Sequence, residues 1–144
     1  MKRFRYSMQN ILDYRRNIEE EKKLKFADAL NEYMQQKEIL CSYEKELSSA
    51  YSSKLSRSQH QVYELKNLYQ YIHYLKEKIE IQKRLVTEAE KTMESWRQQL
   101  ISAQKDRKMI EKHKEKALSQ YYSELDQAEQ KTIDELALYS HMRR

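Results

Sequence analysis

The stretch YQYIHYLKEKIEIQKRLV, residues 69–86, decides the fold, because its apolar residues recur at alternating steps of three and four. Ile72, Ile79 and Val86 lie seven residues apart, and Leu75 falls between the first two. With Ile72 at position a of a heptad, Leu75 takes position d. This spacing is typical of a helix that packs against a partner helix in a left-handed coiled coil.

The same repeat continues on both sides of this stretch. Over residues 68–121, nearly all a and d positions are apolar or aromatic. A 3.5-residue repeat sustained this long predicts a long packed seam between two helices. The seam predicted for this helix contains Leu68, Ile72, Leu75, Ile79, Val86, Met93, Trp96 and Leu100.

The opening stretch FRYSMQNILDYRRNIEEEKK, residues 4–23, carries a narrower apolar stripe. Ile11 and Ile18 share one helix face and are assigned to the seam. The run EEEKK, residues 19–23, then interrupts the stripe with charges that a globular core would not accept. An interrupted stripe of this width indicates a helix with one slender partner.

The composition limits the fold class. The chain has 144 residues, no Gly, no Pro and 35% charged residues. Sheets and α/β folds need many turns, and turns depend on Gly and Pro. Disorder is the other possibility for so polar a chain, but twelve Tyr and a regular apolar period argue against it. We therefore expect an all-α protein.

The most probable break between two helices is the segment SSAYSSKLSRS, residues 48–58, because Ser competes for backbone hydrogen bonds. We predict one antiparallel coiled-coil hairpin over residues 1–144. Its elements are a helix over about residues 2–47, a turn over about residues 48–58 and a helix over about residues 59–138. The second helix is longer and overhangs the first. This folding places Phe4 near Arg107.

Nothing in the sequence favours catalysis. The four His are scattered, without the i, i+4 spacing of a zinc-binding helix, and no Gly-rich phosphate loop can exist without Gly. We expect no cofactor and no metal. Cys41 is alone, which fits a reducing compartment. No apolar run approaches the roughly 20 residues that span a bilayer, and no signal-peptide core follows the basic start, so a cytosolic location is expected.

Basic residues cluster in KDRKMIEKHKEK, residues 105–116, which holds six Lys or Arg against three acids. Nucleic acid is one possible target for such a cluster. Acids interleave throughout and no recognition motif is present, so an acidic protein surface is the simpler partner. The candidate contacts for that partner are Arg107, Lys108 and Lys112.

Aromatic residues gather around the predicted turn. In the heptad register Tyr71 takes position g and Tyr74 position c, so neither lies in the seam. Several Tyr near one end of a helix pair form an amphipathic patch of the kind found at binding sites. The alternative interpretation is that rings such as Tyr69 and Tyr71 lie over the edge of the seam.

Three stretches together resemble the FliJ family, small components of the bacterial flagellar type III export apparatus. The opening FRYSMQNILDYRR, residues 4–16, is similar to the family's aromatic start, apolar pair and Arg. Residues 69–86, followed by SWRQQL, residues 95–100, resemble its second helix. The close EQKTIDELALYSHMRR, residues 129–144, resembles its ending. Family members can carry Gly at the turn, where this chain has Ser.

The resemblance implies a non-enzymatic stalk, similar to the coiled coil of the rotary ATPase γ subunit. Its implied partners are the hexameric export ATPase FliI, the export gate FlhA and export chaperones, with the membrane reached only through these proteins at the flagellar base. By position, Tyr71, Ile72 and Leu75 resemble the family's gate-facing segment, and Tyr74 of the aromatic patch is the fourth candidate gate contact. The residues of the overhang that would face the ATPase ring are Lys131, Asp134, Glu135 and Arg143.

Two other interpretations stay open at this point. In one, the chain is a self-associating scaffold whose a and d residues pair between chains. In the other, it is the stalk of a related type III secretion system. Light scattering and pull-down against the export ATPase would separate a scaffold from a stalk.

Overall fold

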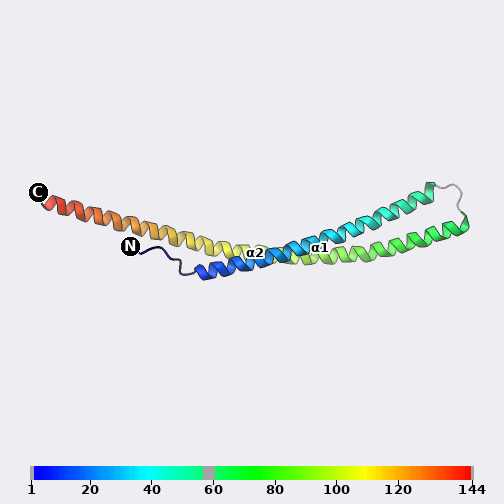
Figure 1. The fold of residues 1–144 in the computed structure, drawn as a ribbon, viewed down its shortest axis with the longest axis horizontal. Helices are drawn as coiled ribbons and strands as arrows, with labels where there is room; N and C mark the ends of the chain where they lie inside the picture. Colours follow the sequence, from blue (N-terminus) through cyan, green and yellow to red (C-terminus); the bar gives the residue numbers. More distant parts are fainter. Residues whose placement is uncertain (1, 57–60, 144) are drawn as a thin grey trace. The chain divides into compact units, whose positions relative to one another are not determined.

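The computed structural model describes residues 2–56 and 61–143. Within them the chain forms two α-helices, α1 over Gln9–Ser56 and α2 over Val62–Met142 (Figure 1), and no strand. Helix α1 has 48 residues and α2 has 81. The predicted all-α pair of helices with a longer second helix is therefore confirmed.

The Ser-rich segment is helical over most of its length. Residues 48–56 belong to α1, although the sequence predicted a turn over residues 48–58. The physical reason is burial: Ala50 is only 6% exposed and packs with Ile72 and Leu75 of α2. This packing outweighs the low helix propensity of Ser, which costs about 0.5 kcal/mol per residue. Residues 57 and 58 of the predicted turn lie outside the described residues.

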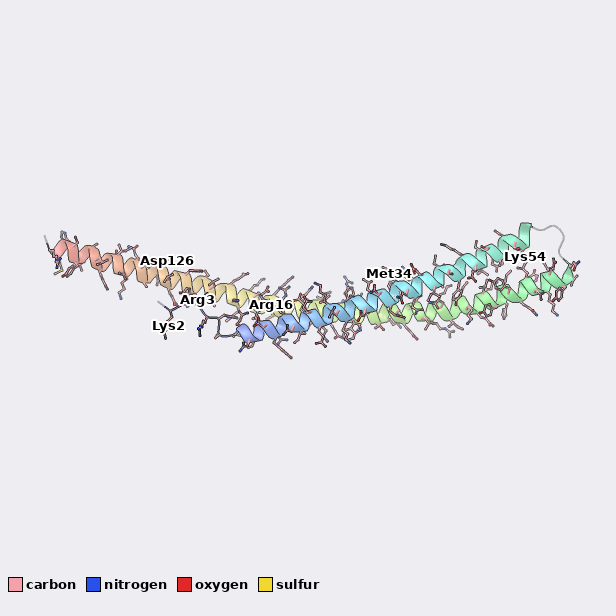
Figure 2. The ribbon with its side chains drawn as sticks, in the orientation of Figure 1. Lys2, Arg3, Arg16, Met34, Lys54 and Asp126 are labelled. Carbon is pink, nitrogen blue, oxygen red and sulfur yellow. The ribbon has the colours of Figure 1, made fainter. Side chains whose placement is uncertain are left out.

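The chain divides into two compact units. The hairpin unit comprises Lys22–Leu100, and the terminal unit comprises Met1–Glu21 together with Ile101–Arg144. Each unit contains part of α1 and part of α2, so each has its own helix–helix packing. Figure 2 shows the side chains along both helices.

In the hairpin unit the two helices run antiparallel. Lys22, early in α1, donates a hydrogen bond from Nζ to Oε1 of Gln99, late in this part of α2, at 2.9 Å. Tyr71, early in α2, donates one to Glu46, late in α1, at 3.2 Å. Contacts between an early residue of one helix and a late residue of the other define a hairpin.

The core of the hairpin unit follows the predicted heptads. Ile72, Leu75 and Ile79 are 5%, 1% and 6% exposed. Gln82, at the next d position, is a buried polar residue at 5% exposure. Its amide nitrogen donates to the backbone oxygen of Gln36 at 3.0 Å and to the Gln36 side-chain oxygen at 2.6 Å. These two bonds satisfy the donor that burial removes from water.

The terminal unit is also antiparallel, with a register that corrects one prediction. Phe4 was expected near Arg107, but its ring lies 5.4 Å from the ring of Tyr121. Arg107 instead pairs with Glu19. Because α1 continues beyond the predicted turn, each α1 residue faces a later α2 residue than expected.

The predicted seam holds along α2 and shifts at one point on α1. Every a and d position from Leu68 to Tyr121 is buried or half-buried. On α1, Ile18 is half-buried, but Ile11 is 44% exposed and its neighbour Leu12 is fully buried. Leu12 therefore occupies the seam in place of Ile11, a shift of about 100° around the helix.

Candidate interaction surfaces

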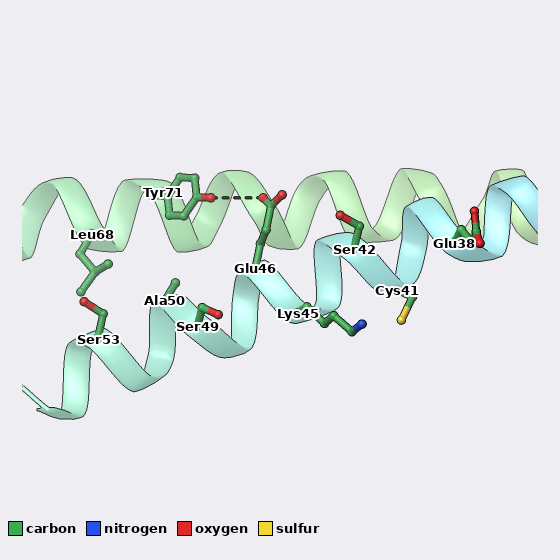
Figure 3. A pocket seen from close by; sticks show the side chains of 10 residues that line it. All are labelled: Glu38, Cys41, Ser42, Lys45, Glu46, Ser49, Ala50, Ser53, Leu68 and Tyr71. Carbon is green, nitrogen blue, oxygen red and sulfur yellow. Dashed lines mark hydrogen bonds between the residues drawn. The ribbon is translucent and has the colours of Figure 1, made fainter.

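The first candidate surface lies in the hairpin unit, where α1 and α2 leave an open groove (Figure 3). Tyr71 stands over this groove at 44% exposure and donates its hydroxyl hydrogen bond to Glu46. Partial burial of the phenol, followed by the charge of Glu46, raises the pKa of Tyr71. Residues that line the groove are Glu38, Cys41, Ser42, Lys45, Glu46, Ser49, Ala50, Ser53, Leu68 and Tyr71.

The four residues that the resemblance assigns to the export gate differ in accessibility. Ile72 and Leu75 are buried in the hairpin core, so a partner could touch them only after the helices separate. Tyr71 and Tyr74 are 44% and 52% exposed. Of these four residues, only Tyr71 and Tyr74 are accessible to a partner in the folded hairpin unit.

Two Tyr of this region, Tyr69 and Tyr74, each have a lysine over the ring. The Nζ atom of Lys54 lies 4.1 Å from the ring centroid of Tyr69, and that of Lys78 lies 5.6 Å from the ring of Tyr74. Such cation–π contacts place positive charge beside the aromatic ring. The patch is thus aromatic and basic together, a combination that suits an acidic partner.

The second candidate surface is the basic cluster of the terminal unit, and Arg107 is at its centre. The Arg107 guanidinium contacts Glu19 on α1 and donates from Nη1 to Oε2 of Glu111 at 2.8 Å. Arg107 is 22% exposed and Glu19 16%. Arg16 reaches Glu111 from the other side at 3.5 Å. Glu19 is the first residue of the charged run that interrupts the α1 stripe. It pairs with Arg107, which is a charged a position of α2.

This network alters the protonation of its members. The hydrogen bonds that Arg107 donates to Glu111 and Glu19 raise the pKa of Arg107. The hydrogen bond and charge of Arg107, with a smaller contribution from Arg16, hold the pKa of Glu111 below its usual 4.5. Arg107 and Glu111 therefore stay charged at neutral pH, and the network joins α1 to α2.

Lys108 and Lys112 differ from Arg107. Both are exposed, and no carboxylate of the described residues lies within ion-pair distance of either. They occupy positions b and f of the heptad, on the side of α2 that faces away from the seam. Of the three predicted contacts for an acidic partner, these two are available, and Arg107 is committed to the helix pair.

A feature that the sequence did not predict lies at the start of the chain. Residues 2–6 precede the helix and lie along α2. The Tyr121 hydroxyl donates to the backbone oxygen of Lys2 at 2.8 Å, and the Tyr6 hydroxyl lies 2.6 Å from Nδ1 of His113. Phe4 packs on Tyr121 between them. A Tyr at the last a position, beyond the reach of α1, was the signal for this contact.

The third candidate surface is the end of α2. Every described residue after Leu125 is exposed (Figure 2). The four predicted ring contacts, Lys131, Asp134, Glu135 and Arg143, all lie in this segment. Asp134 accepts a hydrogen bond from Gln130 at 3.0 Å, and the Arg143 guanidinium lies 4.9 Å from the ring of Tyr139. The structure leaves these side chains open to a partner but brings no two of the four together.

Chemistry-bearing clusters are missing from the part of the chain that the structure describes. Residues 2–56 and 61–143 contain no group of three or more His, Cys, Asp or Glu that could hold a metal ion. Neither helix has, within its described residues, a window apolar enough to cross a membrane. The surfaces described above are therefore open faces of a helix pair.

An antiparallel helix pair with exposed aromatic, basic and unpaired helical faces defines a helical interaction protein. A model of the family described as Flagellar FliJ protein matches residues 4–144. The chain belongs to this family and is thus a non-enzymatic component of the flagellar export apparatus. Comparison with curated proteins and with solved structures gives no match.

Proposed function

We propose that this chain acts as a central stalk, at the cytoplasmic face of the flagellar base, between the export ATPase ring FliI and the export gate FlhA. It also assists the delivery of substrates and chaperones. The end of α2 supports this function. In this chain, which belongs to the FliJ family, all described residues after Leu125 are exposed. An uncovered helix offers its whole circumference to a surrounding ring.

In this proposal, some charged residues of the terminal unit stabilise the helix pair and others contact the ring. Arg107 holds α1 and α2 together through Glu19 and Glu111. Lys108 and Lys112 face away from the seam, and together with the end of α2 they contact the ring. Exposed lysines raise the rate of association with an acidic surface and make binding sensitive to salt.

Reversal of the two free lysines tests the ring contact. Lys108→Glu with Lys112→Glu should weaken binding to purified FliI roughly tenfold or more at low salt, with a smaller difference at high salt. The thermal melt should not change, because neither lysine pairs within the described chain. Binding is measured by pull-down and by surface plasmon resonance.

The matched control reverses Lys66 and Lys91, which are equally exposed lysines of α2 in the hairpin unit. This control changes the net charge by the same amount and should leave ring binding intact. Equal weakening by both pairs would show that only net charge matters and would remove the terminal unit from the contact.

The aromatic patch is tested separately. Tyr71→Ala with Tyr74→Ala should reduce affinity for the cytoplasmic domain of FlhA by roughly tenfold to a hundredfold, since exposed Tyr are frequent hot spots, while FliI binding stays unchanged. Swimming in soft agar should fall in parallel. Tyr14→Ala with Tyr122→Ala, at 62% and 55% exposure, is the control. Normal motility and FlhA binding in the first variant would place the gate contact elsewhere.

A further inference from the structure

The end of α2 carries an apolar stripe that no described part of this chain covers. Leu136 and Tyr139 in this stripe are 64% and 59% exposed. Leu125, Ala128, Thr132 and Ile133, together with the acidic Glu129, line a shallow groove on the helix surface. This is a long apolar face for a surface helix, and apolar faces of this kind mark interaction sites.

The stripe departs from the register of the intramolecular seam. If the heptads continued after Tyr121, three of the next six a and d positions would hold charged residues, namely Glu124, Lys131 and Glu135. The apolar stripe instead steps from Tyr121 to Leu125, an insertion that rotates the contact face around the helix. The new face is therefore built for a partner other than α1. Its members are Leu125, Ala128, Thr132, Leu136 and Tyr139.

We infer that this face binds a second copy of the chain, with the two α2 ends antiparallel. An alignment that sets Thr132 opposite Leu136 of the second copy also sets Ala128 opposite Tyr139. Small residues then face large ones in successive layers, as interdigitated helix packing requires. In a parallel pair each residue would face itself, with Ala128 against Ala128 and Tyr139 against Tyr139.

Charge selects the same orientation. Asp126 and Glu129 come at the start of the segment, Lys131, Asp134 and Glu135 in its middle, and Arg143 at its end. Antiparallel pairing brings the basic end of each copy to the acidic start of the other, and it sets Lys131 beside Glu135 of the second copy. A parallel pair would place Lys131 beside Lys131 and Arg143 beside Arg143, which is unfavourable.

The pairing leaves the folded chain as it is, because α1 does not cover this segment. The contact is short and some of its layers are small, so the buried area falls at the low end for specific interfaces, and a Kd of about 10–100 µM is expected. The paired copies hide the face from other proteins. This inference concerns the chain alone and does not depend on the proposed stalk function.

Sedimentation equilibrium of the full chain over about 5–500 µM tests the pairing. The apparent mass should rise with concentration from that of one chain, 17.7 kDa, toward twice that value. Leu136→Glu should weaken the pairing at least tenfold. Leu138→Glu is the matched control, since Leu138 is 62% exposed but lies outside the stripe. A single-chain mass at all concentrations, or equal effects of the two substitutions, would overturn the inference.

Charge swaps test the orientation. Lys131→Glu and Glu135→Lys should each weaken the pairing, because each places like charges side by side across the contact. The variant with both substitutions should recover it, because the pair is restored with opposite polarity. Recovery is specific to an alignment in which these two residues meet, and its absence would overturn the antiparallel arrangement.

Discussion

Replacement of Leu75 with Asp is expected to unfold the hairpin unit at temperatures where the unsubstituted chain is helical. Leu75 is 1% exposed and packs in a cluster with Ile72 and Ala50. A carboxylate at this position would be buried without a partner, at a cost of about 3–5 kcal/mol. Circular dichroism melts would show a large fall in Tm and in helix content.

The control for this variant is Leu85→Asp, which makes the same chemical change on the same helix. Leu85 is 42% exposed, so a carboxylate there remains hydrated. Leu100→Asp, at a half-buried position of the seam, should fall between the two. An unchanged melt of the Leu75 variant would refute the heptad register.

Removal of the Arg107 charge should lower the melting temperature of the chain by about 5 °C or more. In Arg107→Gln, the carboxylates of Glu19 and Glu111 lose their shared cation while both remain partly buried. Two neighbouring carboxylates without a counter-ion repel each other. The control is Arg97→Gln, because Arg97 pairs only with Glu94 on the same exposed helix face.

The lowered pKa of Glu111 predicts the direction in which the melting temperature changes with pH. The folded-state pKa of Glu111 is lowered, so its contribution to stability is present above the usual carboxyl pKa of 4.5 and is lost as the pH falls through the folded-state value. The Tm of the unsubstituted chain should therefore fall below about pH 4.5, and the gap between it and the Arg107→Gln variant should narrow. A gap independent of pH between 7 and about 3 would contradict the ion-pair explanation.

The seam of α2 could be predicted from the sequence because apolar residues fill most of its a and d positions, with Gln82, Arg107 and Lys114 as the exceptions. On α1 the adjacent pair Ile11 and Leu12 left two possible faces, and the structure buries Leu12 while Ile11 stays 44% exposed. The break was predicted too early, since Ser propensity is weak and the burial of Ala50 depends on a contact distant in sequence.

The sequence predicted which types of residue form the candidate surfaces. It did not predict which of these residues are accessible to a partner. The sequence placed Arg107 in a basic cluster but did not reveal that Glu19 and Glu111 neutralise it. It likewise grouped buried Leu75 with exposed Tyr74. Such distinctions depend on which helix faces meet, and they require coordinates. The roles of these residues toward FliI and FlhA stay predictions.

Gln82 sets a limit on how the helices of the hairpin unit can slide. Heptad seams resemble one another, so a shift by seven residues would still match apolar layers along much of α2. Such a shift would set Ala29 or Tyr43 opposite Gln82, and neither offers the amide oxygen that Gln36 supplies at 2.6 Å. A backbone oxygen would still accept one hydrogen of the Gln82 amide, as that of Gln36 does at 3.0 Å, but the second hydrogen would lose its acceptor. A buried N–H without an acceptor costs about 1–3 kcal/mol, which disfavours the slipped alignment roughly fivefold to a hundredfold. The polar layer formed by Gln82 and Gln36 thus favours one alignment of the two helices in an otherwise repetitive interface.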